Sequence, residues 1–199
     1  LENRKAISAA KAVVPLSQLL GDGMKVQDNT PQERAATVLA DLARLGENKL
    51  LLVDSAAALV AMLSSDSPIA KTSAAGALCQ IASVARNKEK LVEVGIIPPL
   101  VSILQGDLQE AQKLAVGALW HLSMVDFNKG KMVEAGVIPA LVTVLDSEAD
   151  EAREHAVAVI STLTRSHGAN KKTVAQAGGI KPLIQLLTDP SIKTQKHAA

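Results

Sequence analysis

One phrase recurs along this chain with small changes: a glycine, then isoleucine or valine, usually a proline, and then a leucine. Its clearest copies run over residues 95–101, 136–142 and 178–184. With the leucine as register mark, and Leu16 and Leu59 matched to it, the marks fall at 16, 59, 100, 141 and 183, in steps of 43, 41, 41 and 42. A period near ~40 residues is typical of a solenoid, in which each repeat buries its apolar face against its neighbours. The spacing predicts an array of stacked units.

Each unit is predicted to hold three helices. The phrase glycine ends a short first helix, such as 88–94, because the site just past a helix commonly needs a positive φ. The phrase proline lies in the first turn of a second helix, where a missing N–H is no loss. Apolar residues at three- and four-residue spacing predict a longer third helix with Leu119 and Leu122 in the core. Its many alanines and glycines indicate close helix packing.

Composition excludes several classes of protein. Lys+Arg total 21 and Asp+Glu total 20, so a net charge of +1 points to neither nucleic acid nor an acidic membrane. Cys79 is the only cysteine and no Asn-x-Ser/Thr acceptor occurs, which favours a reducing compartment. No run of 18 apolar residues suggests a membrane span. No phosphate-binding loop, nucleophile elbow, His-Glu-x-x-His or Cys-x-x-Cys motif is present, so we expect no catalytic residue, no cofactor and no metal.

The phrase and the third helix together resemble a known family. Gly-Ile-Ile-Pro-Pro-Leu-Val at 95–101, followed by Ala-Val-Gly-Ala-Leu-Trp-His-Leu-Ser at 115–123, resembles the armadillo repeat of β-catenin, importin-α and many plant proteins. Asparagines that open the units favour armadillo over the related HEAT repeat; they are Asn3, Asn87, Asn128 and Asn170. The resemblance covers essentially the whole chain, but the second unit has Asp54-Ser55-Ala56 where the phrase should be.

The resemblance implies an all-α, right-handed superhelix. We expect one armadillo-repeat domain over 1–199, with repeats at about 3–45, 46–86, 87–127 and 128–169 and an incomplete fifth at 170–199. From the phrase leucine to a fixed third-helix position the separation is 21 residues, but 25 in the first unit. We therefore predict a longer loop in the first unit, between residues 21 and 31. The chain is interpreted as a fragment of a longer protein.

In armadillo arrays the third helices line the concave groove, so equivalent residues form rows along it. Spacings of four and seven residues place three rows on one helix face. The first row is Asp41, Gln80, His121 and Thr162; the second is Thr37, Gly76, Gly117 and Ala158; the third is Arg34, Ser73, Leu114 and His155, with His197 as its continuation. We predict that these residues line a peptide-binding groove, with small pockets at Gly76 and Gly117.

Two departures bear on what that groove binds. Peptide-binding relatives carry asparagine in the first row and tryptophan in the second, and neither is present here, which argues against recognition of nuclear import signals. Trp120 is interpreted as inter-repeat packing rather than an interface anchor. The histidines at 121, 155 and 197 could suggest a metal or pH-sensing site, but stacked helices lie roughly 8–10 Å apart, which places histidines of successive repeats too far apart for shared ligation.

The resemblance implies a non-catalytic scaffold that binds an extended peptide or a partner helix in the concave groove. Two alternatives stay open: the substrate-binding region of a U-box-type ubiquitin ligase, and a structural element of a filament- or membrane-associated scaffold. The expected partner is a protein or peptide, or further repeats of the same chain, with no nucleic acid and no direct membrane insertion. The expected location is the cytoplasm or the nucleus.

Overall fold

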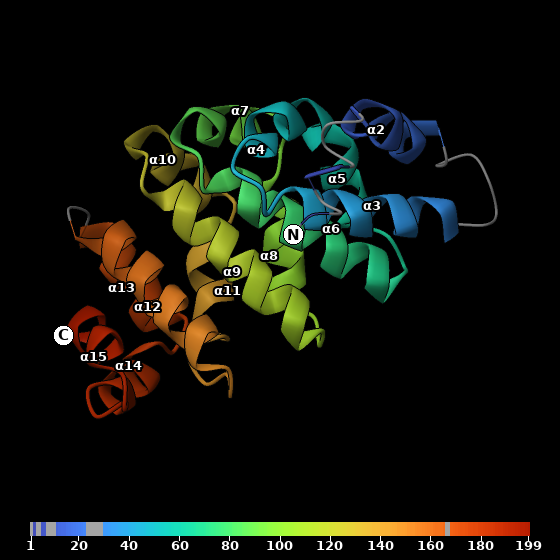
Figure 1. Cartoon of the computed structure of the whole chain (residues 1–199). Helices are drawn as coiled ribbons and strands as arrows, with labels where there is room; N and C mark the ends of the chain where they lie inside the picture. The colour runs from blue at the N-terminus through green and yellow to red at the C-terminus, as the bar shows by residue number, and fades with distance from the viewer. Residues whose placement is uncertain (1, 3–4, 7–10, 23–29, 166–167) are drawn as a thin grey trace. The chain divides into compact units, whose positions relative to one another are not determined.

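The protein is described by a computed structural model that covers residues 2, 5–6, 11–22, 30–165 and 168–199. The residues it describes form helices and no strand, so the all-α prediction is confirmed (Figure 1). The chain divides into two compact units, Leu1–Pro99 and Leu100–Ala199. The division falls inside helix α8, Ile97–Leu104.

The first unit holds parts of three repeats. Its α-helices are α2 (Val13–Asp22), α3 (Thr30–Leu42), α4 (Asn48–Leu51), α5 (Ala56–Met62), α6 (Pro68–Ala82) and α7 (Lys88–Glu93). Two short 3-10 helices, Leu52–Ser55 and Ala85–Asn87, join α4 to α5 and lead into α7. The loop predicted for the first repeat falls largely on residues 23–29, which lie outside the described residues, although residues 21 and 22 belong to α2.

The second unit follows the same three-helix plan. Its helices are α9 (Gln109–Ser123), α10 (Asp126–Glu134), α11 (Val137–Val142), α12 (Asp150–Thr164), α13 (Gly168–Gln176), α14 (Ile180–Leu186) and α15 (Ile192–Ala198). As predicted, α9 and α12 are long third helices of 15 residues each. The first-turn positions expected for the prolines are also confirmed, because Pro98, Pro139 and Pro182 lie in the first turns of α8, α11 and α14.

The phrase glycines end the first helices as predicted. Gly95, Gly136 and Gly178 have φ of 81°, 75° and 81°, values that other residues rarely adopt. At Gly95 the amide donates to Val92 O at 3.1 Å, and the next amide, of Ile96, donates to Leu91 O at 3.3 Å. These paired bonds satisfy carbonyls that a helix end otherwise leaves without partners.

Two repeats have no glycine at this position. Lys11 occupies the glycine register in the first repeat and keeps a positive φ of 54°. Asp54 occupies it in the second repeat, where the chain continues through the 3-10 helix Leu52–Ser55 instead. Both replacements place a charged side chain where the later repeats have none.

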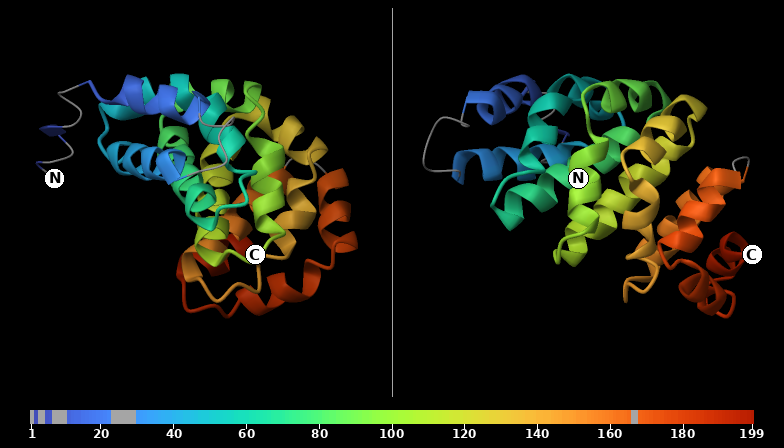
Figure 2. Two further views of the ribbon diagram at one scale, coloured as in Figure 1. Left: turned by 90° about the vertical axis from the view of Figure 1, so that its right-hand side faces the viewer. Right: turned by 180° about the vertical axis from the view of Figure 1, so that it is seen from behind.

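Third helices of consecutive repeats pack side by side within each unit. In the first unit α3 packs on α6. In the second, α12 (orange in Figure 2) packs on both α9 (yellow-green) and α15 (red). The alanines predicted to allow this approach are buried, among them Ala36, Ala75, Ala115 and Ala156. Leu119 and Leu122 are fully buried, as predicted. Small residues on facing helices let the backbones come close.

Buried asparagines tie each first helix to the third helix before it. The bonds run from Nδ2 to a main-chain carbonyl: Asn48 to Leu42 (3.0 Å), Asn87 to Ile81 (3.1 Å), Asn128 to Leu122 (3.1 Å) and Asn170 to Leu163 (2.6 Å). Asn48 extends the predicted series, and Asn3 lies outside the described residues. Because a buried carbonyl without a partner is costly, these asparagines stabilise the end of each third helix.

Candidate functional site

The twelve predicted groove residues are shared equally between the two units. Six lie on α3 and α6 of the first unit: Arg34, Thr37, Asp41, Ser73, Gly76 and Gln80. Six lie on α9 and α12 of the second unit: Leu114, Gly117, His121, His155, Ala158 and Thr162. Within each unit the two helices pack side by side, so the structure brings equivalent residues of consecutive repeats together.

In the first unit the predicted residues form a polar face. Arg34, Thr37 and Asp41 on α3 are exposed, and Ser73, Gly76 and Gln80 on α6 are half-buried. Two hydroxyls of this face are in contact: Thr37 Oγ1 and Ser73 Oγ lie 3.0 Å apart. Thr37 also donates to Glu33 O at 2.8 Å, so its only hydroxyl hydrogen is used and Ser73 donates to Thr37.

The remaining polar groups of this face are open to solvent. Asp41 and Arg44 form an exposed ion pair with a distance of 3.7 Å between Oδ1 and Nε. Such a pair contributes little to stability, typically about 0–1 kcal/mol. Replacing Arg44 by a group of the partner at the Asp41 carboxylate would therefore cost little stability.

In the second unit the middle row is covered. Gly117 and Ala158 are buried, which corrects the expectation of an open pocket at Gly117. Leu114 and His121, about one turn to either side of Gly117, are half-buried and reach the surface. Because Gly117 has no side chain, it lies below the surface that the longer side chains of Leu114 and His121 form. Gly76 of the first unit differs, because it keeps part of its surface exposed.

An aromatic stack joins two third helices of the second unit. The rings of Trp120 and His155 have centroids 4.8 Å apart with 16° between their planes, and His121 lies 4.9 Å from Trp120 at 45°. The packing role predicted for Trp120 is therefore confirmed, with His155 of the next repeat as its partner. The sequence signalled this contact only weakly, since His155 belongs to a groove row and Trp120 belongs to none.

The environment of His155 disfavours its protonated form. Burial lowers the pKa of His155, Glu151 and Glu154 raise it in part, and Lys193 on α15 lowers it further. Its Nδ1 is buried and has no hydrogen-bond partner among the described residues. A proton on that nitrogen would be placed without an acceptor, which is consistent with the lowered pKa.

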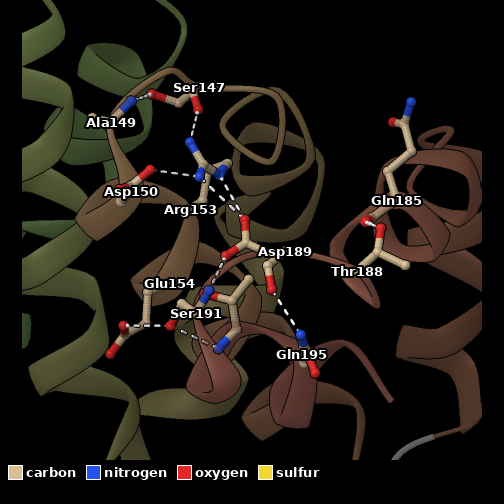
Figure 3. Close-up of polar contacts among 11 residues, drawn as sticks. Ser147, Ala149, Asp150, Arg153, Glu154, Gln185, Thr188, Asp189, Ser191 and Gln195 are labelled. Atoms are coloured by element: carbon tan, nitrogen blue, oxygen red, sulfur yellow. Dashed lines mark hydrogen bonds and ion pairs between the residues drawn. The ribbon is translucent and has the colours of Figure 1, made fainter.

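A polar network that sequence reasoning missed joins the fourth and fifth repeats (Figure 3). Arg153 Nη2 donates to Asp150 Oδ1 at 2.6 Å and to Asp189 Oδ2 at 3.1 Å, while Nη1 donates to Ser147 O at 2.7 Å. Asp189 is buried, and its Oδ1 accepts from the amide of Ser191 at 2.8 Å. Every polar atom of the buried carboxylate is thus partnered.

Register could have identified part of this network. Gln112, Arg153 and Gln195 occupy equivalent positions, each 12 residues after its phrase leucine. Each donates to a carbonyl of the loop before its helix: Gly106 O at 2.6 Å, Ser147 O at 2.7 Å and Asp189 O at 2.8 Å. These side chains hold the turns between second and third helices rather than the face that is open to a partner.

The described residues hold no group of three or more His, Cys, Asp or Glu side chains placed to bind a metal ion. Within the same residues, no helix is both long enough and apolar enough to cross a membrane.

The family model for the armadillo/β-catenin-like repeat matches residues 85–124, 128–165 and 169–199. These ranges correspond closely to the third, fourth and fifth repeats and omit the two repeats that lack the phrase glycine. A comparison with curated proteins finds no significant match.

Several solved structures that are similar to this chain are designed or engineered proteins. The chain is 28% identical to a computationally designed armadillo repeat protein for modular peptide recognition, with a TM-score of 0.82 over 92% of this chain and 78% of that one. It is 27% identical to a designed armadillo repeat protein in complex with the peptide (KR)4, with a TM-score of 0.81 over 99% and 83% of the two chains. An engineered protein is 30% identical, with a TM-score of 0.84 over 98% of this chain and 48% of that one.

Proposed function

Because the chain belongs to the armadillo/β-catenin-like repeat family, we propose that it is a non-catalytic scaffold that binds an extended segment of a partner protein along its third helices. The observation that carries the proposal is the row of polar side chains at equivalent positions on packed third helices, as with Asp41 and Gln80 in the first unit. The similar designed armadillo repeat protein that is in complex with the peptide (KR)4 supports a peptide as the partner.

Binding would use the main chain of the partner. Packed helices lie roughly 8–10 Å apart and an extended strand rises ~3.3 Å per residue, so each repeat would span two to three partner residues. Asp41 can accept hydrogen bonds, and Gln80 can both donate and accept. Thr162 uses its hydroxyl hydrogen on Ala158 O at 2.8 Å, so it offers a partner only an acceptor. The row therefore favours partner N–H groups over partner carbonyls at Thr162.

The two units contribute different surfaces to this function. The first presents exposed polar side chains and a partly exposed Gly76, whereas in the second Gly117 and Ala158 are buried and His155 stacks on Trp120. Side-chain pockets would then be confined to the first unit, and the second would contribute mainly main-chain contacts. Such a scaffold belongs in the cytoplasm or nucleus, which the single cysteine, Cys79, supports.

Selection from a random twelve-residue peptide library tests the proposal. Affinities of the selected peptides are measured by fluorescence anisotropy for the wild type, Asp41→Ala, Gln80→Ala and the control Ser102→Ala, which changes an exposed residue of the second helix α8. Each row variant should weaken binding about 2–10-fold, the usual effect of losing one hydrogen bond, and the control should not. Peptides that bind all four proteins equally would show that the third helices are not the binding face.

A further inference from the structure

A second candidate site lies in the first unit, away from the third helices. A cavity of about 640 Å³ opens between α2 and the segment that runs from α4 into α5. Its apolar lining residues are Val13, Val14, Leu51, Ala57 and Ala58. Ser17, Gln18 and Ser55 add polar groups, and Lys11 and Asp54 are the charged residues. Its volume is within the usual range for ligand sites, about 300–1,000 Å³, and an apolar lining with few polar groups is typical of them.

The lining departs from the repeat pattern in its charged residues. Lys11 and Asp54 both occupy the register that glycine holds in the three later repeats, and both line this one cavity. Lys11 keeps the left-handed backbone, with φ of 54°, that a side chain disfavours. Unfavourable backbone conformations of this kind cluster at binding sites. Packing gives no reason for a lysine there, since glycine makes the same turn elsewhere in the chain.

The rim departs from the pattern as well. Val14 is 62% exposed and Leu51 is 59% exposed, and both line the cavity. Each of the buried asparagines Asn48, Asn87 and Asn128 is followed three residues later by the same helix position, which holds Leu51 in the second repeat but Lys90 and Lys131 in the next two. A leucine there places apolar surface beside an apolar cavity, the arrangement expected of a docking surface.

The two charged residues of the cavity, Asp54 and Lys11, differ in whether they form an ion pair with a described residue. Asp54 is paired with Lys90, whose Nζ lies 2.6 Å from Oδ1. The hydroxyls of Ser17 and Ser55 contact each other, and Ser17 donates to Val13 O at 2.6 Å. Lys11 forms no ion pair with any described residue, so among those residues the cavity presents apolar walls and one cation without a counter-ion.

We propose that this cavity is a second protein-docking site, which receives an apolar side chain of a partner segment while a neighbouring carboxylate of that segment pairs with Lys11. Charge complementarity selects an acidic partner, because the carboxylate of Asp54 is already matched. The apolar rim selects a protein segment over a small amphiphile: Val14 and Leu51 extend the contact surface beyond the volume that a small ligand fills. The site lies on α2 and on the segment from α4 into α5, so it does not depend on binding along the third helices.

The repeat pattern supplies variants that should preserve the fold. Lys11→Gly removes the cation and restores the residue that the later repeats use at this turn; Lys11→Asn is a second choice, because asparagine tolerates the left-handed conformation. Leu51→Lys makes the second repeat match the third and fourth. Lys171→Ala, which removes an exposed cation from the second unit, is the matched charge control. Thermal melting of each variant establishes that it is folded.

The probe is a phage-displayed random twelve-residue library, selected on the wild type after depletion on Leu51→Lys. We expect enriched peptides with an aromatic or aliphatic residue next to Asp or Glu. Their affinity should fall about tenfold or more in Lys11→Gly and in Leu51→Lys, and stay unchanged in Lys171→Ala and in the third-helix variant Asp41→Ala. Peptides without acidic residues, or peptides whose binding is insensitive to Lys11→Gly and Lys11→Asn, would overturn the proposal.

A separate titration with dodecanoate, an amphiphilic anion, tests the other ligand chemistry. The protein partner would be overturned by three results together: dodecanoate binds the wild type, it displaces the peptides, and it does not bind the Lys11 and Leu51 variants. The cavity would then be assigned to a small amphiphile. Failure of Asp41→Ala and Gln80→Ala to weaken their own selected peptides would instead bear on the third-helix proposal alone.

Discussion

The indole of Trp120 lies nearly parallel to the imidazole of His155, with 4.8 Å between ring centroids and 16° between planes. The two residues come from α9 and α12, the third helices of consecutive repeats. The stack holds the imidazole with Nδ1 turned into the protein, where no described residue accepts a proton from it. Packing between repeats thereby determines the protonation behaviour of a residue on the predicted binding face.

Stability should fall in mild acid because of His155. Its pKa is lowered in the folded protein by burial, whereas the unfolded chain binds the proton near the ordinary value of about 6.5. The unfolded state therefore binds more protons between the folded pKa and about 6.5, and the free energy of unfolding decreases as pH falls through that window. Above it both states are neutral, and no penalty remains.

Urea titrations at pH 7.5 and pH 5.5 measure this effect. His155→Gln should show a smaller loss of stability between the two pH values than the wild type. An equal loss in wild type and His155→Gln would mean that other groups cause the acid sensitivity.

Removing Arg153 should destabilise the junction of the fourth and fifth repeats. Arg153→Ala leaves the carboxylate of Asp189 buried without its cation, and losing one partner of such a pair costs about 3–5 kcal/mol. We expect the lower end of that range, because the amide of Ser191 still donates to Asp189. Urea unfolding gives the magnitude, and hydrogen exchange should show faster opening of α15.

The double variant is the control for this prediction. Arg153→Ala with Asp189→Ala removes both charges, so it should cost less than Arg153→Ala alone. A double variant that costs the sum of the two single changes would show that the two groups do not interact.

Leu119 and Leu122 should be core positions. Each is fully buried on α9, so Leu→Ala at either position should lower the free energy of unfolding by about 2–5 kcal/mol. Leu187→Ala is the matched control, since Leu187 is 43% exposed. A loss below about half a kcal/mol at both buried positions would contradict the assignment of the inner face of α9.

Gly117→Trp should destabilise the second unit. The sequence alone predicts that this change is tolerated, because Gly117 belongs to a row on the groove face. Its burial reverses the expectation: a large ring must displace packed neighbours, at a cost of about 1–3 kcal/mol or more. Melting followed by circular dichroism decides between the two, since an unchanged Tm would show that the site is open.

The sequence by itself determined the repeats and their helices. A period near 41 residues, glycines with a positive φ just past the first helices, prolines in the first turns of the second and small residues in the third are local signals. Each acts over a few residues through backbone geometry, so each can be identified without knowing what lies across the interface. Buried asparagines also follow from register, since Asn87 and Asn170 recur at one position.

Only the tertiary structure decided how the faces of those helices are used. The burial of Gly117, the Trp120–His155 stack and the Arg153–Asp189 pair depend on which side chains of the next repeat reach across and how far. Residues at equivalent positions of different repeats have different surroundings, because the neighbouring side chains differ from repeat to repeat. The cavity beside Lys11 also depends on tertiary packing. The sequence shows a charge where the later repeats have glycine, but only the packing of two repeats places apolar residues around that charge.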